Sequence, residues 1–133
     1  MEYSSSHKKE IALGILKQIE DAILRLQERT VKIKCANDFL LTPEGMEKLD
    51  AACMLLIAIG ESLKNIDKVT EKQLLITYPS IPWRNIMGIR DIIAHHYFNI
   101  DAEEIFEIVS NELNPLLKAI HYFIRELSTE TEL

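Results

Sequence analysis

The 133-residue sequence predicts an all-α protein, an antiparallel up-and-down bundle of four to five helices. Apolar residues recur at steps of three and four over long stretches, which is the spacing of one helix face. The sequence lacks strand-like alternation, and four glycines and four prolines are too few for the turns of a β-sandwich or barrel. One core suffices at this length, so we expect a single domain over residues 1–133, with a frayed tail at residues 129–133.

The first long helix is expected from about residue 8 to residue 34, after serines that can cap its first turn. Its apolar face consists of Ile11, Ile15, Ile19, Ala22, Ile23, Leu26, Thr30 and Ile33. Arg25, Arg29 and Lys32 form a basic stripe on the outer face. A solvated helix face is the ordinary reason for such a stripe, and contact with RNA phosphates is the alternative.

A second long helix is expected after a loop at residues 37–43, because Thr42 can cap it and Pro43 suits its first position. Small residues in this helix would let another helix come close, and they are Ala51, Ala52, Ala58 and Gly60. Glu61 follows directly. It is either a paired carboxylate that faces a functional site or an ordinary surface glutamate.

Two prolines separate the second helix from the third. Residues 70–78 are expected to form at most a short helix, because Pro79 and Pro82 push the residue before each of them into extended geometry. Pro82 then begins a third main helix, which we expect from Trp83 to about His95.

The last helix is expected to begin at Asp101, with Glu104 three residues later completing a cap-like pair. Its apolar positions are Ile105, Ile108, Val109, Leu113, Leu116, Leu117, Ile120, Phe123, Ile124 and Leu127. Pro115 lies inside this pattern and should kink or split the helix.

Composition excludes several classes of protein. No apolar run approaches the ~18 residues of a membrane span, and the N-terminus has no signal-peptide core. The formal net charge of −6 argues against a protein that coats nucleic acid through phosphate contacts, so RNA would have to meet a local basic patch. Cys35 and Cys53 lack the spacing of a zinc site, so we expect buried or free thiols in a reducing, cytoplasmic setting.

Residues 82–98 combine an arginine, a carboxylate, two histidines and a tyrosine with apolar residues. Titratable groups cost free energy to bury unless they are satisfied, so the segment is either a structural network or a functional site. Asp91 and His95 lie on one helix face, where the carboxylate can hold one imidazole nitrogen and leave the other free for proton transfer. Arg90 and His95 are five apart and point about 140° away from each other on one helix.

Two arrangements would bring Arg90 and His95 together. The helix could end near His95 so that the ring swings round, or two copies could meet across a two-fold axis. We expect the two-fold dimer, because the apolar residues of the segment supply more contact surface than one short helix needs. These residues are Ile86, Ile89, Ile93 and Phe98.

An arginine and a histidine together suit cleavage of a phosphodiester bond. Arginine binds phosphate through two parallel hydrogen bonds and stabilises the charge that develops on its oxygens. Histidine can take a proton from a ribose 2′-hydroxyl or give one to the leaving oxygen. The acidic residues are scattered, and the adjacent His95 and His96 point apart on a helix, so we expect neither a metal ion nor a cofactor.

Three segments carry a resemblance to a known family: Gly60-Glu61, residues 78–83 and residues 90–101. The last of these fills the pattern Arg-x4-His-x-Tyr with Arg90, His95 and Tyr97. In these segments the chain resembles the HepT branch of the HEPN superfamily. The similarity runs from the second helix to the last.

The resemblance implies an all-helical HEPN-like bundle that dimerises, with Arg90 and His95 of both copies forming a metal-independent endoribonuclease site. We expect Asp91 to orient His95 there. It also implies the toxin of a toxin–antitoxin pair, whose antitoxin is an MNT-type nucleotidyltransferase that transfers AMP from ATP to Tyr97. A bulky, negatively charged group at Tyr97 would block the cleft and repel RNA.

His96 stands where a small residue is commoner in the family, and we expect His96 and Glu61 to support the site. The expected partners are RNA, a second copy of the chain and the nucleotidyltransferase, with no DNA and no membrane. The alternative is a non-catalytic helical module whose cleft only docks the nucleotidyltransferase, which the net charge favours slightly. A third interpretation is a subunit that presents a small molecule to that enzyme.

Overall fold

In a computed structural model of the protein, the backbone is described for residues 2–96 and 98–132, and the side chains for residues 6–96 and 98–129. The elements are α1 (Glu2–Arg29), α2 (Asn37–Leu40), α3 (Pro43–Val69), the 3-10 turn η1 (Leu75–Thr77), α4 (Trp83–His95), α5 (Ala102–Asn111) and α6 (Leu113–Glu132). Every regular element in these ranges is helical, which confirms the all-α prediction.

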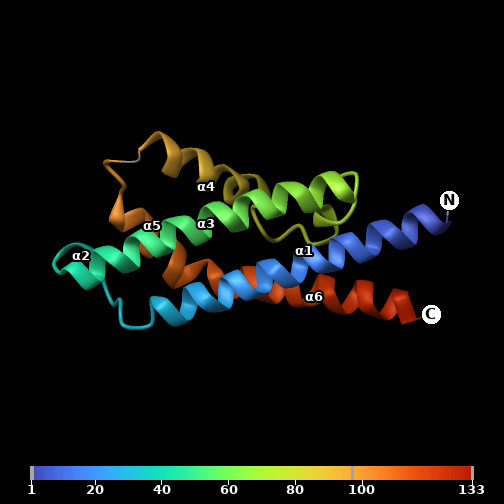
Figure 1. The fold of residues 1–133 in the computed structure, drawn as a ribbon, viewed down its shortest axis with the longest axis horizontal. Helices are drawn as coiled ribbons and strands as arrows, with labels where there is room; N and C mark the ends of the chain where they lie inside the picture. The colour runs from blue at the N-terminus through green and yellow to red at the C-terminus, as the bar shows by residue number, and fades with distance from the viewer. Residues whose placement is uncertain (1, 97, 133) are drawn as a thin grey trace.

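Three long helices form the body of the bundle. Helices α3 and α6 both pack against α1 and run antiparallel to it, so the two ends of the chain lie at the same end of the molecule (Figure 1). Helix α4 lies along α3, and α5 packs on α3 and α6. This is the antiparallel up-and-down arrangement that the sequence predicts.

The core lies where α1, α3 and α6 meet. Its largest fully buried side chains are Phe39, Phe123, Leu16, Ile19, Ile23, Leu26, Ile59, Leu63, Ile66, Leu113 and Ile120. The start of α4 is anchored to this core, because Trp83 Nε1 donates a hydrogen bond to the Tyr78 carbonyl at 3.0 Å and the Trp83 ring lies 5.8 Å from that of Phe123. A buried aromatic ring whose N–H is satisfied holds its helix in place.

Two expected helix starts are confirmed. Thr42 Oγ1 accepts a hydrogen bond from the Gly45 amide at 2.9 Å, directly ahead of α3. Asp101 Oδ1 accepts hydrogen bonds from the amides of Glu103 and Glu104 at 3.0 and 3.3 Å, directly ahead of α5. A side-chain cap of this kind stabilises a helix by about 1 kcal/mol.

The expected loop at residues 37–43 contains the short helix α2, so that part of the loop prediction is wrong. Phe39 is fully buried and anchors the segment to the core. Helix α2 then packs so closely on the start of α3 that a Cβ at Gly45 would lie 2.0 Å from the Asp38 carbonyl oxygen. Polar and turn-forming residues indicate a loop locally, but they do not reveal a long-range burial.

Helix α1 differs from its predicted range at both ends. It spans Glu2–Arg29, whereas residues 8–34 were expected. Lys32 lies beyond its end, so the predicted basic stripe does not continue along one helix. Arg25 within the stripe forms an ion pair with Asp21 at 3.6 Å, as an ordinary solvated face does.

The split expected near Pro115 is confirmed. Helix α5 ends at Asn111 and α6 begins at Leu113, with Glu112 between them, and Pro115 stands in the first turn of α6, where its missing N–H needs no partner. Residues 70–78 contain only the short turn η1. Helix α6 continues to Glu132, into the segment that was expected to fray.

Both cysteines are free thiols, as expected, with Cys35 exposed and Cys53 buried. Burial, with a smaller contribution from the charge of Asp50, raises the pKa of Cys53 to about 11. None of the helices in the described ranges combines the length and apolar character that crossing a membrane requires.

Candidate functional site

Helix α4 buries one face and exposes the other. Trp83, Ile86, Ile89 and Ile93 recur at steps of three and four and pack against the core. The remaining positions toward its C-terminal end are exposed, and these carry the chemistry-bearing side chains of Arg90, Asp91 and His95. The sequence therefore places these polar side chains on the exposed side of the helix.

Gly60 lets α3 approach α4 closely. A Cβ at Gly60 would lie 3.4 Å from the Ile86 carbonyl oxygen and 3.8 Å from the Arg90 Cβ, which confirms that a small residue meets a neighbouring helix here. This approach brings Glu61 within reach, and its Oε1 lies 3.3 Å from Arg90 Nε. Lys64 lies 3.8 Å from the same Glu61 oxygen. Of the two interpretations of Glu61, the paired carboxylate beside the site is the one observed.

Arg90 lies between two carboxylates. Its Nη1 donates a hydrogen bond to Asp91 Oδ1 at 3.1 Å, in addition to the ion pair with Glu61. The side chains of Arg90, Glu61 and Asp91 are each about half exposed. Ion pairs this exposed contribute about 0–1 kcal/mol, so a phosphate that approaches Arg90 can replace them at little cost.

His95 is held by a backbone oxygen rather than by the predicted carboxylate. Its Nδ1 lies 2.7 Å from the carbonyl oxygen of Asp91, while the Asp91 carboxylate turns to Arg90. A carbonyl oxygen can only accept, so this hydrogen bond requires a hydrogen on Nδ1 and leaves Nε2 as the ring nitrogen that is not bound to the Asp91 carbonyl. One ring nitrogen is therefore held and the other left free, as expected, but the group that holds it is the Asp91 carbonyl and not the Asp91 carboxylate.

Arg90 and His95 do not meet within one chain. Helix α4 does end at His95, as one of the two predicted arrangements requires. The ring nevertheless stays over Asp91, while Arg90 faces Glu61 on α3. Within the described residues, no hydrogen bond or ion pair joins the guanidinium to the imidazole.

The apolar surface proposed for a dimer is smaller than the sequence suggested. Ile86, Ile89 and Ile93 are 4–8% exposed and belong to the core of the single chain, so they cannot be the contact surface of a second copy. Phe98, which is 92% exposed, and Ile92, which is 44% exposed, remain at this end of α4. The dimer stays a prediction, and Phe98 is the one of its four expected contact residues that is exposed.

His96 follows the last residue of α4, and its amide donates to the carbonyls of Ile92 and Ile93 at 3.2 and 3.3 Å. Its side chain lines a hollow between α4 and α5 rather than facing Arg90. Tyr97, the expected acceptor of AMP, lies outside the described residues. In the part of the chain that is described, no three His, Cys, Asp or Glu side chains come together as a metal site.

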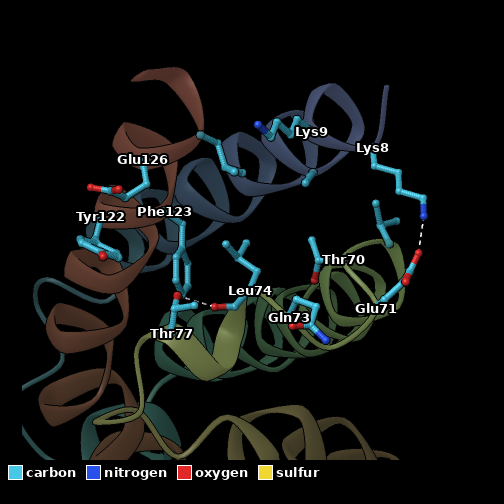
Figure 2. Close-up of a pocket in the computed structure, with 13 residues that line it drawn as sticks. Lys8, Lys9, Thr70, Glu71, Gln73, Leu74, Thr77, Tyr122, Phe123 and Glu126 are labelled. Atoms are coloured by element: carbon cyan, nitrogen blue, oxygen red, sulfur yellow. Dashed lines mark hydrogen bonds and ion pairs between the residues drawn. The ribbon is translucent and has the colours of Figure 1, made fainter. Parts of the chain in front are cut away.

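A second hollow, of about 430 Å³, lies between the first half of α1, the end of α3 and α6 (Figure 2). Lys8 and Glu71 form an ion pair beside it, and the hydrogen bond and charge of Lys8 lower the pKa of Glu71. Lys9 and Glu126 also line the hollow, so its formal charges balance. None of the predicted site residues lines this hollow. The sequence pattern does not indicate it, because Lys8 and Glu71 are 63 residues apart.

The comparisons with known proteins agree on one family. A family profile described as "Ribonuclease HepT-like" matches residues 19–123. A protein named "Probable ribonuclease HepT" from Thermococcus cleftensis is 33% identical over 103 residues, which cover 77% of this chain and 86% of that protein. A protein of Methanocaldococcus jannaschii, named as a candidate RNase, is 35% identical over 77 residues, which cover 58% of this chain and 60% of the relative.

No solved structure matches the chain. The matched range nevertheless begins within α1 and ends within α6, and so includes Glu61 and every described residue of the α4 site. The helical architecture and the match over most of the chain agree, and on these grounds the protein belongs to the HepT-like ribonuclease family of HEPN-type helical bundles.

Proposed function

We propose that the protein is a metal-independent endoribonuclease whose site combines Arg90 and His95. The observation that carries this proposal is the placement of His95, whose Nδ1 is held by the Asp91 carbonyl and whose side chain is exposed. An imidazole held in one tautomer at the surface suits general acid–base chemistry on a large substrate. Family membership supplies the substrate class, RNA.

The proposed reaction uses the ribose 2′-hydroxyl as an internal nucleophile. His95 Nε2 takes the hydroxyl proton, the 2′-oxygen bonds to phosphorus, and the bond from phosphorus to the 5′-oxygen breaks. That oxygen leaves with a proton from a general acid, so the products are a 2′,3′-cyclic phosphate and a 5′-hydroxyl. Arg90 stabilises the charge on the non-bridging oxygens, which is the role that guanidinium groups serve best.

Two copies of the chain form the site in this proposal. Arg90 and His95 face different neighbours within one chain, so a second copy has to supply the missing partner to each. Phe98 provides exposed apolar surface beyond the end of α4 for that contact. Glu61 and Asp91 hold Arg90 in place until phosphate replaces them, and His96 plays a supporting part at the helix end.

The biological role we propose is that of a toxin controlled by a nucleotidyltransferase antitoxin, which transfers AMP to Tyr97. This part rests on the Arg-x4-His-x-Tyr pattern of the family. Tyr97 follows His95 by two residues, so an added phosphate would introduce negative charge close to the proposed site and repel RNA.

The test is cleavage of total RNA by the purified protein in the presence of EDTA. We expect the wild type to cut, and His95→Ala to lose at least about 100-fold in rate with its melting temperature unchanged. His121→Ala is the matched control, because His121 is also half exposed but pairs with Glu20 on α1, outside the site. Full activity in His95→Ala would overturn the proposal.

The alternative function is a non-catalytic module that docks the nucleotidyltransferase, and the net charge of −6 favours it. It predicts no RNA cleavage by the wild type at any protein concentration, with or without EDTA. It also predicts that Arg90→Ala or His95→Ala weakens binding of the nucleotidyltransferase, because both residues belong to the docking cleft. Cleavage that requires His95 excludes it.

A further inference from the structure

The net charge of the protein comes from one part of the chain. Residues 91–117 contain six carboxylates and no lysine or arginine, and the rest of the chain holds fifteen acidic and fifteen basic residues, which cancel. The six are Asp91, Asp101, Glu103, Glu104, Glu107 and Glu112. This segment runs from the end of α4 through α5 to the start of α6.

A groove runs between α4 and α5 in this acidic segment. It consists of two neighbouring hollows of about 530 and 290 Å³, which share Ile92, Glu104 and Ile108 in their lining. Isoleucines from both helices form its floor, among them Ile92, which is 44% exposed. Glutamates of α5 and the turn after it form one wall.

The glutamates of the groove form no ion pair with a described residue. In the described part of the chain, Glu104, Glu107 and Glu112 form no ion pair, and Glu107 only accepts a hydrogen bond from the Asn111 amide at 2.7 Å. Burial, followed by the charges of Glu107 and Glu104, raises the pKa of Glu112. Among the described residues, Arg84 is the one lysine or arginine that lines the groove.

We propose that this groove binds a basic amphipathic helix of a protein partner, with apolar side chains on the isoleucine floor and lysines or arginines against Glu104, Glu107 and Glu112. Charge complementarity selects this occupant. RNA would set phosphates against carboxylates that only Arg84 offsets, which is unfavourable. A second copy packed symmetrically on the same groove would set glutamates against glutamates.

The inference is independent of RNA cleavage, because its test reads binding alone. The probe is a fluorescein-labelled synthetic helix with leucines on one face and lysines on the other, and its binding to the full protein is followed by anisotropy. We expect Glu104→Gln combined with Glu107→Gln to weaken binding at least about tenfold. Arg84→Gln should strengthen binding, and raised salt should weaken it.

The matched control is Glu44→Gln combined with Glu47→Gln, which removes the same charge at the same spacing from the first turns of α3. We expect this control to bind as the wild type does. Ile92→Ser should weaken binding without unfolding the protein, because Ile92 is 44% exposed.

Equal weakening by the two glutamine pairs would overturn the proposal, since it would reveal only general attraction to an acidic protein. Wild-type protein that fails to bind the probe, or that binds a version with glutamates in place of lysines equally well, would also overturn it. So would a single-stranded RNA oligonucleotide that displaces the probe from the groove, because RNA would then be the occupant.

Discussion

The two ends of α4 differ in what surrounds them. At the start, Trp83 and Ile86 are 9% and 6% exposed, and the Trp83 N–H bonds to the Tyr78 carbonyl. At the other end, Arg90 and His95 are exposed and are held only by Glu61 and by the helix itself. The first turns of α4 therefore stabilise the fold, and its last turns carry the reactive side chains. Mutations at the two ends should separate these properties.

The largest effect on stability is expected at Ile86. Ile86→Ala should lower the free energy of unfolding by about 2–5 kcal/mol, because it removes buried methyl groups and leaves a cavity. Ile92→Ala, on the exposed side of the same helix, should change it by less than about 1 kcal/mol. Urea denaturation of both variants measures the contrast, and equal losses would show that α4 is not buried on the side described.

A smaller loss is expected for Trp83→Phe. The substitution leaves the Tyr78 carbonyl without its donor at a partly buried position, which should cost about 1–3 kcal/mol. Trp83 is the only tryptophan, so unfolding has to be followed by circular dichroism rather than fluorescence. Cleavage by the folded variant should be unchanged, and a specific loss of activity would contradict the division between the two ends.

Asp91→Asn tests what holds the imidazole. The Asp91 carboxylate contacts Arg90 and not His95, so its loss removes an exposed ion pair and should slow cleavage by roughly fivefold at most. If the carboxylate fixed the tautomer, as the sequence suggested, the loss would be about 10⁴-fold. The cleavage rate of Asp91→Asn at saturating RNA decides between these two accounts.

The smallest effect is expected at Glu112, and it depends on pH. Its pKa is raised in the folded chain, so the folded state favours the protonated form and loses stability as pH rises through that pKa. Glu112→Gln should therefore melt slightly higher than the wild type at pH 7. Below the ordinary glutamate pKa of about 4.3 the difference should disappear. A melting temperature that is lower than wild type at pH 7 would contradict this.

Local patterns predicted α4 well. Pro82 and the three- and four-residue spacing of its apolar side chains fix where the helix begins and which face it buries, and the bounds Trp83–His95 follow from them. The same spacing could not tell whether Ile86 and Ile89 meet their own chain or a second copy. Both are buried in the core of their own chain, so Phe98 is the one expected dimer contact that is exposed.

Contacts between segments that are distant in the chain could not be predicted from the sequence. The burial of Phe39 that forms α2, and the ion pair of Lys8 with Glu71, depend on how whole helices pack. The prediction that the Asp91 carboxylate holds His95 was wrong for a different reason. A spacing of four residues brings His95 near Asp91, but it does not say whether the carbonyl or the carboxylate of Asp91 binds the ring.

The central claim is that Arg90 of one copy and His95 of another act on the same phosphate. Mixing the separately inactive Arg90→Ala and His95→Ala proteins, after unfolding and refolding them together, tests this most directly. We predict that the mixture cuts RNA, because mixed dimers contain one intact Arg90 and one intact His95. A mixture that stays as inactive as either variant alone, although it refolds and forms mixed dimers, would contradict the claim.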